Sequence, residues 1–174
     1  MIISADAVKM HIKTSEDKTV LEEKLQALEL LIRAYTNNNF QERSIRFKCP
    51  IMSTKVYLST KLLHANETVQ ISESMYNDGV YTIKAIYDDF MELDKPLIDE
   101  PEVLVTKVVY PMDVKMGVVN MLKWDLENRD KVGIQSETIS RHSVTYFNMD
   151  GDNSVMGYPR SLLGFLKPYK KARF

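Results

Sequence analysis

In the stretch YNDGVYTIKAIYDDFMEL, residues 76–93, short runs of β-forming residues alternate with turn residues. Asn77-Asp78-Gly79 is typical of a tight turn between strands. The β-forming residues 80–83 follow it, and Asp88-Asp89 can turn the chain again before residues 90–93. The stretch therefore predicts short strands joined by turns.

Similar short runs of β-formers extend on both sides, from about Gln41 to Val109. Residues 44–48 and 69–71 alternate in the manner of strands, and residues 103–109 read as one more strand. Five or six strands in fewer than about seventy residues predict a compact β-sheet or small barrel.

Helical spacing precedes this β region. Ser4 can cap a short helix that ends near His11, and a second helix runs to about Tyr35. Apolar residues recur in the second helix at steps of mostly three and four, which indicates a buried stripe. Asn37 and its asparagine neighbours predict the end of this helix, because asparagine tolerates left-handed backbone.

Helical spacing returns after the β region. Pro111 is favoured at a first helical position and opens a helix that runs to about Arg129. The residues expected on its buried face are Met112, Met116, Val119, Leu122 and Leu126. Gly117 lowers the helix propensity by up to about 1 kcal/mol, so we expect another helix to approach closely there.

The C-terminal part mixes both patterns. Ile139 to Phe147 is expected to form one arm of a β-hairpin whose loop is Asp150-Gly151-Asp152-Asn153. A short helix is predicted from Arg160 to about Leu166, ended by Pro168.

Together these patterns predict an α+β fold, a small helical bundle with a C-terminal β-hairpin arm, interrupted by an inserted small β-sheet or barrel domain. The discontinuous helical domain would comprise residues 1–41 and 110–174, and the inserted β domain residues 42–109.

Composition excludes several classes of protein. With 24 acidic and 23 basic residues, the chain lacks the basic excess of a generic nucleic-acid binder. Its single cysteine, Cys49, cannot form an internal disulfide or a thiolate metal cluster. The first residues lack a secretory signal, and no apolar run is long enough for a transmembrane helix, so we expect synthesis in a reducing cytoplasm.

Residues that could carry chemistry lack the necessary partners. Asn148-x-Asp150-x-Asp152 resembles a calcium loop, but the glycine and glutamate of that motif are replaced by Asn153 and Pro159. Three histidines, His11, His64 and His142, show no paired spacing. Cys49 has no nearby base and is expected to be a buried or half-buried structural thiol. We therefore expect no catalytic residue, no metal and no cofactor.

Charge is uneven along the chain. Residues 88–102 contain seven acids and one base, Lys95, whereas residues 153–174 contain no acid. The basic and aromatic ending LKPYKKARF, residues 166–174, is either a frayed terminus or a segment that orders on a partner.

The second half of the chain resembles the head-tail connector, or adaptor, proteins of tailed bacteriophages. The resemblance lies in YPMDVKMGVVNMLKWDLENRDKVGIQSETISRHSVTY, residues 110–146, and in GYPRSLLGFLKPYKKARF, residues 157–174. The N-terminal helices ending near Ala34-Tyr35-Thr36-Asn37 also fit, so the resemblance covers roughly 105 residues. The β region departs from the smallest members of the family, although related connectors carry inserts at this place.

The resemblance implies a structural virion protein and not an enzyme. Such proteins form a homo-oligomeric ring of about twelve subunits below the portal, with one surface of each subunit meeting a different surface of its neighbour. The ring extends the channel through which DNA passes and offers a platform for a head-closure, stopper or tail-completion protein. The chain would be assembled in the bacterial host cytoplasm and reside in the virion, with no membrane partner and no sequence-specific DNA contact.

The resemblance also implies that a C-terminal segment docks on the portal. The residues expected there are Arg160, Lys167, Tyr169, Lys170, Lys171, Arg173 and Phe174. The extended arm is able to reach a neighbouring subunit, and the expected ring-interface residues are Ile139, Arg141, Val144 and Tyr146.

An alternative is that the β region is an oligonucleotide-binding barrel, which would make the chain a nucleic-acid module. Tyr76, Tyr81 and Tyr87 are the candidates for base stacking. The acidic stretch and the lack of an aligned aromatic and basic strand pattern oppose this interpretation.

Overall fold

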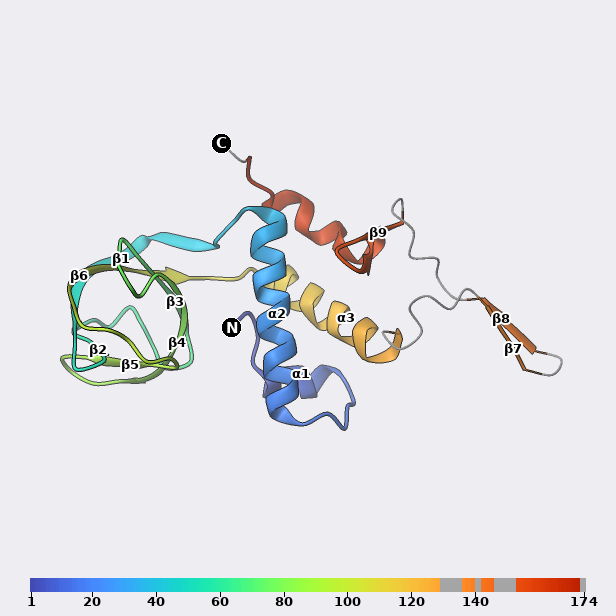
Figure 1. Ribbon diagram of the computed structural model, residues 1–174, viewed down its shortest axis with the longest axis horizontal. Helices are drawn as coiled ribbons and strands as arrows, with labels where there is room; N and C mark the ends of the chain where they lie inside the picture. The colour runs from blue at the N-terminus through green and yellow to red at the C-terminus, as the bar shows by residue number, and fades with distance from the viewer. Residues whose placement is uncertain (129–135, 140–141, 146–152, 173–174) are drawn as a thin grey trace. The chain divides into compact units, whose positions relative to one another are not determined.

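The computed structural model describes residues 1–128, 136–139, 142–145 and 153–172. The chain has an α+β fold with two compact units (Figure 1). One unit contains Met1 and Asn38–Tyr110, and the other contains Ile2–Asn37 together with the described residues from Pro111 onward.

The first unit is a closed antiparallel barrel with the strand order β1-β2-β5-β4-β3-β6, in which β6 pairs with β1. Its strands are β1 (Gln41–Met52), β2 (Lys55–Val56), β3 (Thr68–Ser72), β4 (Gly79–Ile86), β5 (Met91–Leu93) and β6 (Glu100–Val108). Closure leaves this sheet without unpaired edges.

Alternate strand residues fill the barrel. The buried apolar side chains are Cys49, Ile51, Val56, Leu63, Val69, Ile71, Tyr81, Ile83, Met91, Leu93, Leu97, Val103 and Val105. In β1 and β6, Cys49 lies opposite Val103 and Phe47 opposite Val105. This register directs Phe47 and Cys49 of β1 and Val103 and Val105 of β6 inward, as a period of two requires.

The turns of the barrel only partly follow the sequence prediction. The turn at Asp88-Asp89 is confirmed, because the Tyr87 amide donates to the Phe90 carbonyl across it at 2.8 Å. The prediction of a tight turn at Asn77-Asp78-Gly79 is wrong, since Gly79 is the first residue of β4 and residues 73–78 form a longer loop. The tight turn lies instead between β1 and β2, where Ser53 and Thr54 have φ values of 50° and 64°.

The second unit contains α1 (Ala5–His11), α2 (Lys18–Thr36), α3 (Met112–Asn128) and the 3₁₀ helix η2 (Arg160–Tyr169). The prediction of Ser4 as a cap is confirmed, because its hydroxyl accepts a hydrogen bond from the Ala7 amide at 3.2 Å. The end of α2 is also confirmed, since Asn37 is left-handed with a φ of 49°.

The face of α3 is predicted incorrectly in part. Met112 and Met116 are 69% and 37% exposed, whereas Val114, Val118 and Met121 are fully buried. The close approach at Gly117 is confirmed, because a Cβ built there would lie 2.3 Å from Cζ of Phe165 in η2. Packing of η2 against Gly117 therefore selects a different side of α3 from the one that the methionine spacing indicates.

The C-terminal elements also differ from the prediction. β7 (Ser136–Ile139) pairs with β8 (His142–Thr145), so the expected single arm at residues 139–147 is divided between two strands. Tyr158 and Pro159 form the short strand β10, which pairs with β9 (Ser154–Val155). Pro168 lies inside η2 and does not end it at Leu166, because the fixed φ of proline is compatible with a helical turn and only one amide donor is lost.

Candidate interaction surfaces

The C-terminal segment is attached to the helices of its own unit. The Tyr169 hydroxyl lies 2.8 Å from each carboxylate oxygen of Asp113 in α3. Donation of this hydrogen bond to an anionic group raises the pKa of Tyr169 above its ordinary value of 10.0. The contact places the end of η2 beside the first turn of α3.

The residues after η2 lie along the C-terminal end of α2. The Lys170 ammonium nitrogen is 3.7 Å from the centre of the Tyr35 ring. The Lys171 amide donates to the Thr36 carbonyl at 2.8 Å, and the Asn37 side-chain amide donates to the Ala172 carbonyl at 2.8 Å. Cations are favourable at this position, because the last carbonyls of a helix carry partial negative charge.

The predicted portal-binding residues within the described chain therefore share one ordered segment. Arg160, Lys167, Lys170 and Lys171 are exposed on it, whereas Tyr169 is half-buried. Arg173 and Phe174 lie outside the described residues.

Two of the predicted ring-interface residues, Ile139 and Val144, lie on the hairpin of β7 and β8. Ile139 lies opposite His142, and Val144 lies opposite Glu137. The other two residues, Arg141 and Tyr146, lie outside the described residues. The backbone thus places two of the four on neighbouring strands.

A hollow of about 250 Å³ lies in the helical unit, lined by Lys24, Ala27, Leu28, Leu31, Asp125 and Tyr158. The buried Asp125 carboxylate contacts the Lys24 ammonium at 3.3 Å and accepts from the Tyr158 hydroxyl at 3.2 Å. The sequence pattern does not predict this site. Its one sequence signal is an acid at a position of α3 adjacent to buried apolar residues.

A second surface is formed by one end of the barrel, where the β1–β2 turn, the loop 73–78 and the β5–β6 loop meet. We call it the free end, because the chain enters and leaves the barrel at the opposite ends of β1 and β6. Glu100 is buried there and its Oε1 accepts from the Ser74 hydroxyl at 2.6 Å and the Tyr76 amide at 3.0 Å. Its Oε2 accepts from the Met75 amide at 3.1 Å.

These donors lower the pKa of Glu100, with the Ser74 hydrogen bond as the largest cause. A single carboxylate thus fixes the backbone of the loop 73–78 in one conformation. The role of Glu100 is not apparent from the sequence, because Glu100 stands among the seven acids of residues 88–102.

Further hydrogen bonds join the other loops of the free end. The Asn77 side chain donates to the Ile98 carbonyl at 2.8 Å and accepts from the Ile98 amide at 2.9 Å. The Thr54 amide donates to Asp99 at 3.1 Å. These hydrogen bonds fix a surface on which large apolar side chains are exposed. The exposed fractions are 45% for Met52, 82% for Met75, 63% for Tyr76 and 55% for Ile98.

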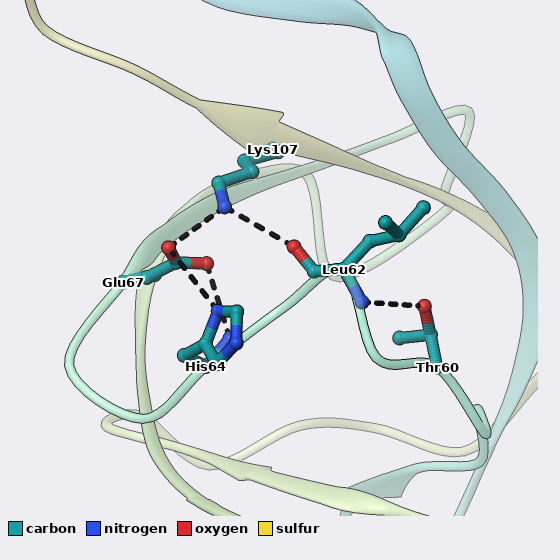
Figure 2. Close-up of polar contacts among 5 residues, drawn as sticks. All are labelled: Thr60, Leu62, His64, Glu67 and Lys107. Carbon is teal, nitrogen blue, oxygen red and sulfur yellow. Dashed lines mark hydrogen bonds and ion pairs between the residues drawn. The ribbon is translucent and has the colours of Figure 1, made fainter.

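His64 belongs to a polar cluster that attaches the loop between β2 and β3 to β6 (Figure 2). The Lys107 ammonium donates to Glu67 at 2.7 Å and to the Leu62 carbonyl at 3.1 Å. The His64 amide donates to Glu67 at 3.1 Å, and the Leu62 amide donates to the Thr60 hydroxyl at 3.1 Å. Burial acts to raise the pKa of Glu67, but the contacts with Lys107 and His64 outweigh it and the pKa is lowered. These contacts indicate a structural role for the cluster.

The three tyrosines considered for base stacking do not form one platform. Tyr76 belongs to the free end. Tyr81 is buried in the barrel, and its hydroxyl donates a hydrogen bond to the Asn77 carbonyl at 2.8 Å. Tyr87 follows the opposite end of β4, a strand of eight residues or roughly 26 Å, and its ring stacks on Phe90 with centroids 4.4 Å apart.

Cys49 does not belong to a cluster of metal-ligating side chains within the described residues. Burial raises the pKa of the Cys49 thiol to about 11, which confirms the expectation of a buried thiol. No group of three or more histidine, cysteine or acidic side chains suited to a metal ion occurs in that part of the chain. Asn148, Asp150 and Asp152 lie outside it.

No helix among the described residues combines the length and apolar character needed to cross a membrane. No protein-family model matches the chain, and no curated protein sequence matches it either.

Proposed function

We propose that the chain is a structural head-tail connector subunit of a tailed bacteriophage, without catalytic activity, metal or cofactor. It forms a homo-oligomeric ring below the portal, extends the DNA channel and provides a platform for a head-closure, stopper or tail-completion protein. In this proposal residues 1–41 and 110–174 are the connector domain with its hairpin arm, and residues 42–109 are an inserted barrel.

The observation that carries the proposal is the ordered C-terminal segment. It holds Arg160 and Lys167 exposed in a stretch free of acids, and its later residues lie on α2 and α3. A partner would meet cations whose backbone is already fixed, so little ordering entropy is lost on docking. This supports a contact with carboxylates of the portal.

Ring formation requires a heterologous contact between copies. The hairpin of β7 and β8 supports such a contact, because a two-stranded hairpin is at best marginally stable alone in water. We propose that Ile139, Arg141, Val144 and Tyr146 contribute to it.

Co-sedimentation with purified portal rings, combined with electron microscopy, tests the proposed function. The wild-type chain should bind portal and appear as a ring coaxial with it. The double charge reversal Arg160→Glu with Lys167→Glu should weaken binding at least tenfold, whereas the exposed control Lys61→Glu in the barrel should bind as wild type. Absence of any portal binding or ring by the wild-type chain would contradict the proposal.

A second candidate function is binding of single-stranded nucleic acid by the barrel. It is favoured by the stacked Tyr87 and Phe90 rings, since the Lys55 ammonium lies 4.3 Å from the Phe90 ring centre and Tyr57 packs beside it. Fluorescence anisotropy with a labelled oligonucleotide tests it. Binding that Tyr87→Ala abolishes would support this function, and no binding at low salt would exclude it.

A further inference from the structure

We propose that the free end of the barrel docks on a second copy of this chain, on the exposed side of α3 and the acid-free stretch 153–172 of that copy. The inference deepens the proposed function, on whose self-assembly it rests, by naming a second pair of surfaces in the contact between copies.

The free end has the properties of a preformed binding surface. Met75 and Tyr76 project from a loop whose amides are held by the buried Glu100, and Ile98 is held by Asn77. Ordering this loop on binding therefore costs little free energy. Aromatic residues and methionine are enriched at protein interfaces, and four large apolar side chains are exposed together on this one rim.

Exposed acids surround these apolar side chains. Glu73 and Asp78 belong to the same loop, and Asp99 is adjacent to Ile98. Bases also lie nearby, but Lys48 already contacts Glu73 and Glu102, at 3.9 Å and 2.9 Å, and the Lys95 ammonium donates to the Val80 carbonyl at 3.0 Å. A partner of this surface should therefore be apolar with a basic fringe.

The helical unit offers a surface of this kind. Met112, Lys115 and Met116 are spaced by three and four residues, so they share one side of α3, and both methionines are exposed. Residues 153–172 contain no acid, and Met156 and Arg160 are exposed among them.

Charge favours this pairing over a symmetric one. Two free ends facing each other would place Glu73, Asp78 and Asp99 against the same acids. A contact between unlike surfaces avoids that repulsion, and it leaves both surfaces available on every copy. Such a contact propagates from copy to copy and closes into a ring when the rotation between neighbours permits.

Cross-linking from the free end identifies its partner. Met75→Cys, labelled with a benzophenone maleimide, carries the only accessible thiol in the described residues, because Cys49 is buried with a raised pKa. After irradiation, the full-length chain, alone and with portal, should give a product of twice the chain mass. Mass spectrometry should locate the junction at residues 112–116 or 153–172 of the second copy.

A matched pair of variants measures the contribution to assembly. Met75→Asp should raise the concentration for half-assembly at least tenfold in sedimentation velocity, with an unchanged melting temperature because the side chain is 82% exposed. Met10→Asp is the control, since Met10 in α1 is 84% exposed and lies outside both surfaces.

The outcomes separate this inference from the proposed function. Junctions between two free ends, junctions within one chain, or assembly of Met75→Asp equal to wild type would overturn the inference while rings on the portal remain possible. A wild-type chain that stays monomeric at all concentrations, with and without portal, would overturn both.

Discussion

Replacement of Gly117 by alanine should destabilise the helical unit, against the usual preference of helices for alanine. In α3 this glycine lies directly under the Phe165 ring of η2, and the new Cβ would come within 2.3 to 2.4 Å of three ring atoms. Favourable carbon contacts lie at about 3.5 to 4.0 Å, so the ring must move by more than about 1 Å.

The expected magnitude is the difference of two effects. Forcing a methyl group into a packed site lowers the free energy of unfolding by about 1–3 kcal/mol. The higher helix propensity of alanine offsets up to about 1 kcal/mol of this loss. We expect a net loss of about 1 kcal/mol and a melting temperature lower by about 2–4 °C for a chain of this size.

Thermal unfolding followed by circular dichroism at 222 nm measures the effect. Gly164→Ala in η2 is the matched control, because a Cβ there meets no atom within 4 Å. In a Phe165→Ala background the sign should reverse, and Gly117→Ala should stabilise by up to about 1 kcal/mol. An increase in melting temperature of the same size in both backgrounds would refute the steric reasoning.

Four other predictions concern single side chains. Glu100→Gln should lower the stability of the barrel at pH 7. The pKa of Glu100 is lowered below 4.5, so its contribution to the free energy of unfolding is present above that pH and is lost as the pH falls through the folded pKa. Urea unfolding of the variant should therefore depend less on pH in this acidic range. The Cys49 thiol should react with a disulfide reagent at pH 8 only after unfolding, and rapid reaction of the native protein would contradict its burial. Tyr169→Phe should accelerate tryptic cleavage at the C-terminal lysines, with mass spectrometry of timed digests as the readout. Val144→Asp should reduce ring formation in electron microscopy more than His142→Ala does, and equal effects would count against the hairpin as an interface.

The local features of the fold were predictable where one residue determines the backbone. Ser4 satisfies orphan amides at a helix start, and Asn37 tolerates the left-handed conformation that ends α2, whatever lies around them. Gly117 was predicted as a close contact because a glycine inside a helix is unfavourable unless the missing side chain is needed.

Features that depend on distant residues were not predictable from local pattern. Asn77-Asp78-Gly79 has the composition of a tight turn, but Glu100, more than twenty residues away, holds the loop open with its hydrogen bonds. Met112 and Met116 match the apolar period of α3, yet packing of η2 at Gly117 turns them outward. The apolar rim of the barrel is not apparent from local pattern for the same reason, since its side chains come from the end of β1, the loop 73–78 and the β5–β6 loop.

The discontinuous helical unit imposes an order of events during synthesis. α2 leaves the ribosome before the 38–110 segment, while α3 and η2, which complete its unit, follow it. At about 5–20 residues per second, translation of that segment takes roughly 4–15 s. During this time α3 and η2 are not yet available to cover the apolar stripe of α2. The barrel unit is contiguous in the chain apart from Met1 and can fold within the same interval. A nascent chain stalled once residue 110 has left the ribosomal exit tunnel should therefore carry a finished barrel and an α2 that is available to chaperones.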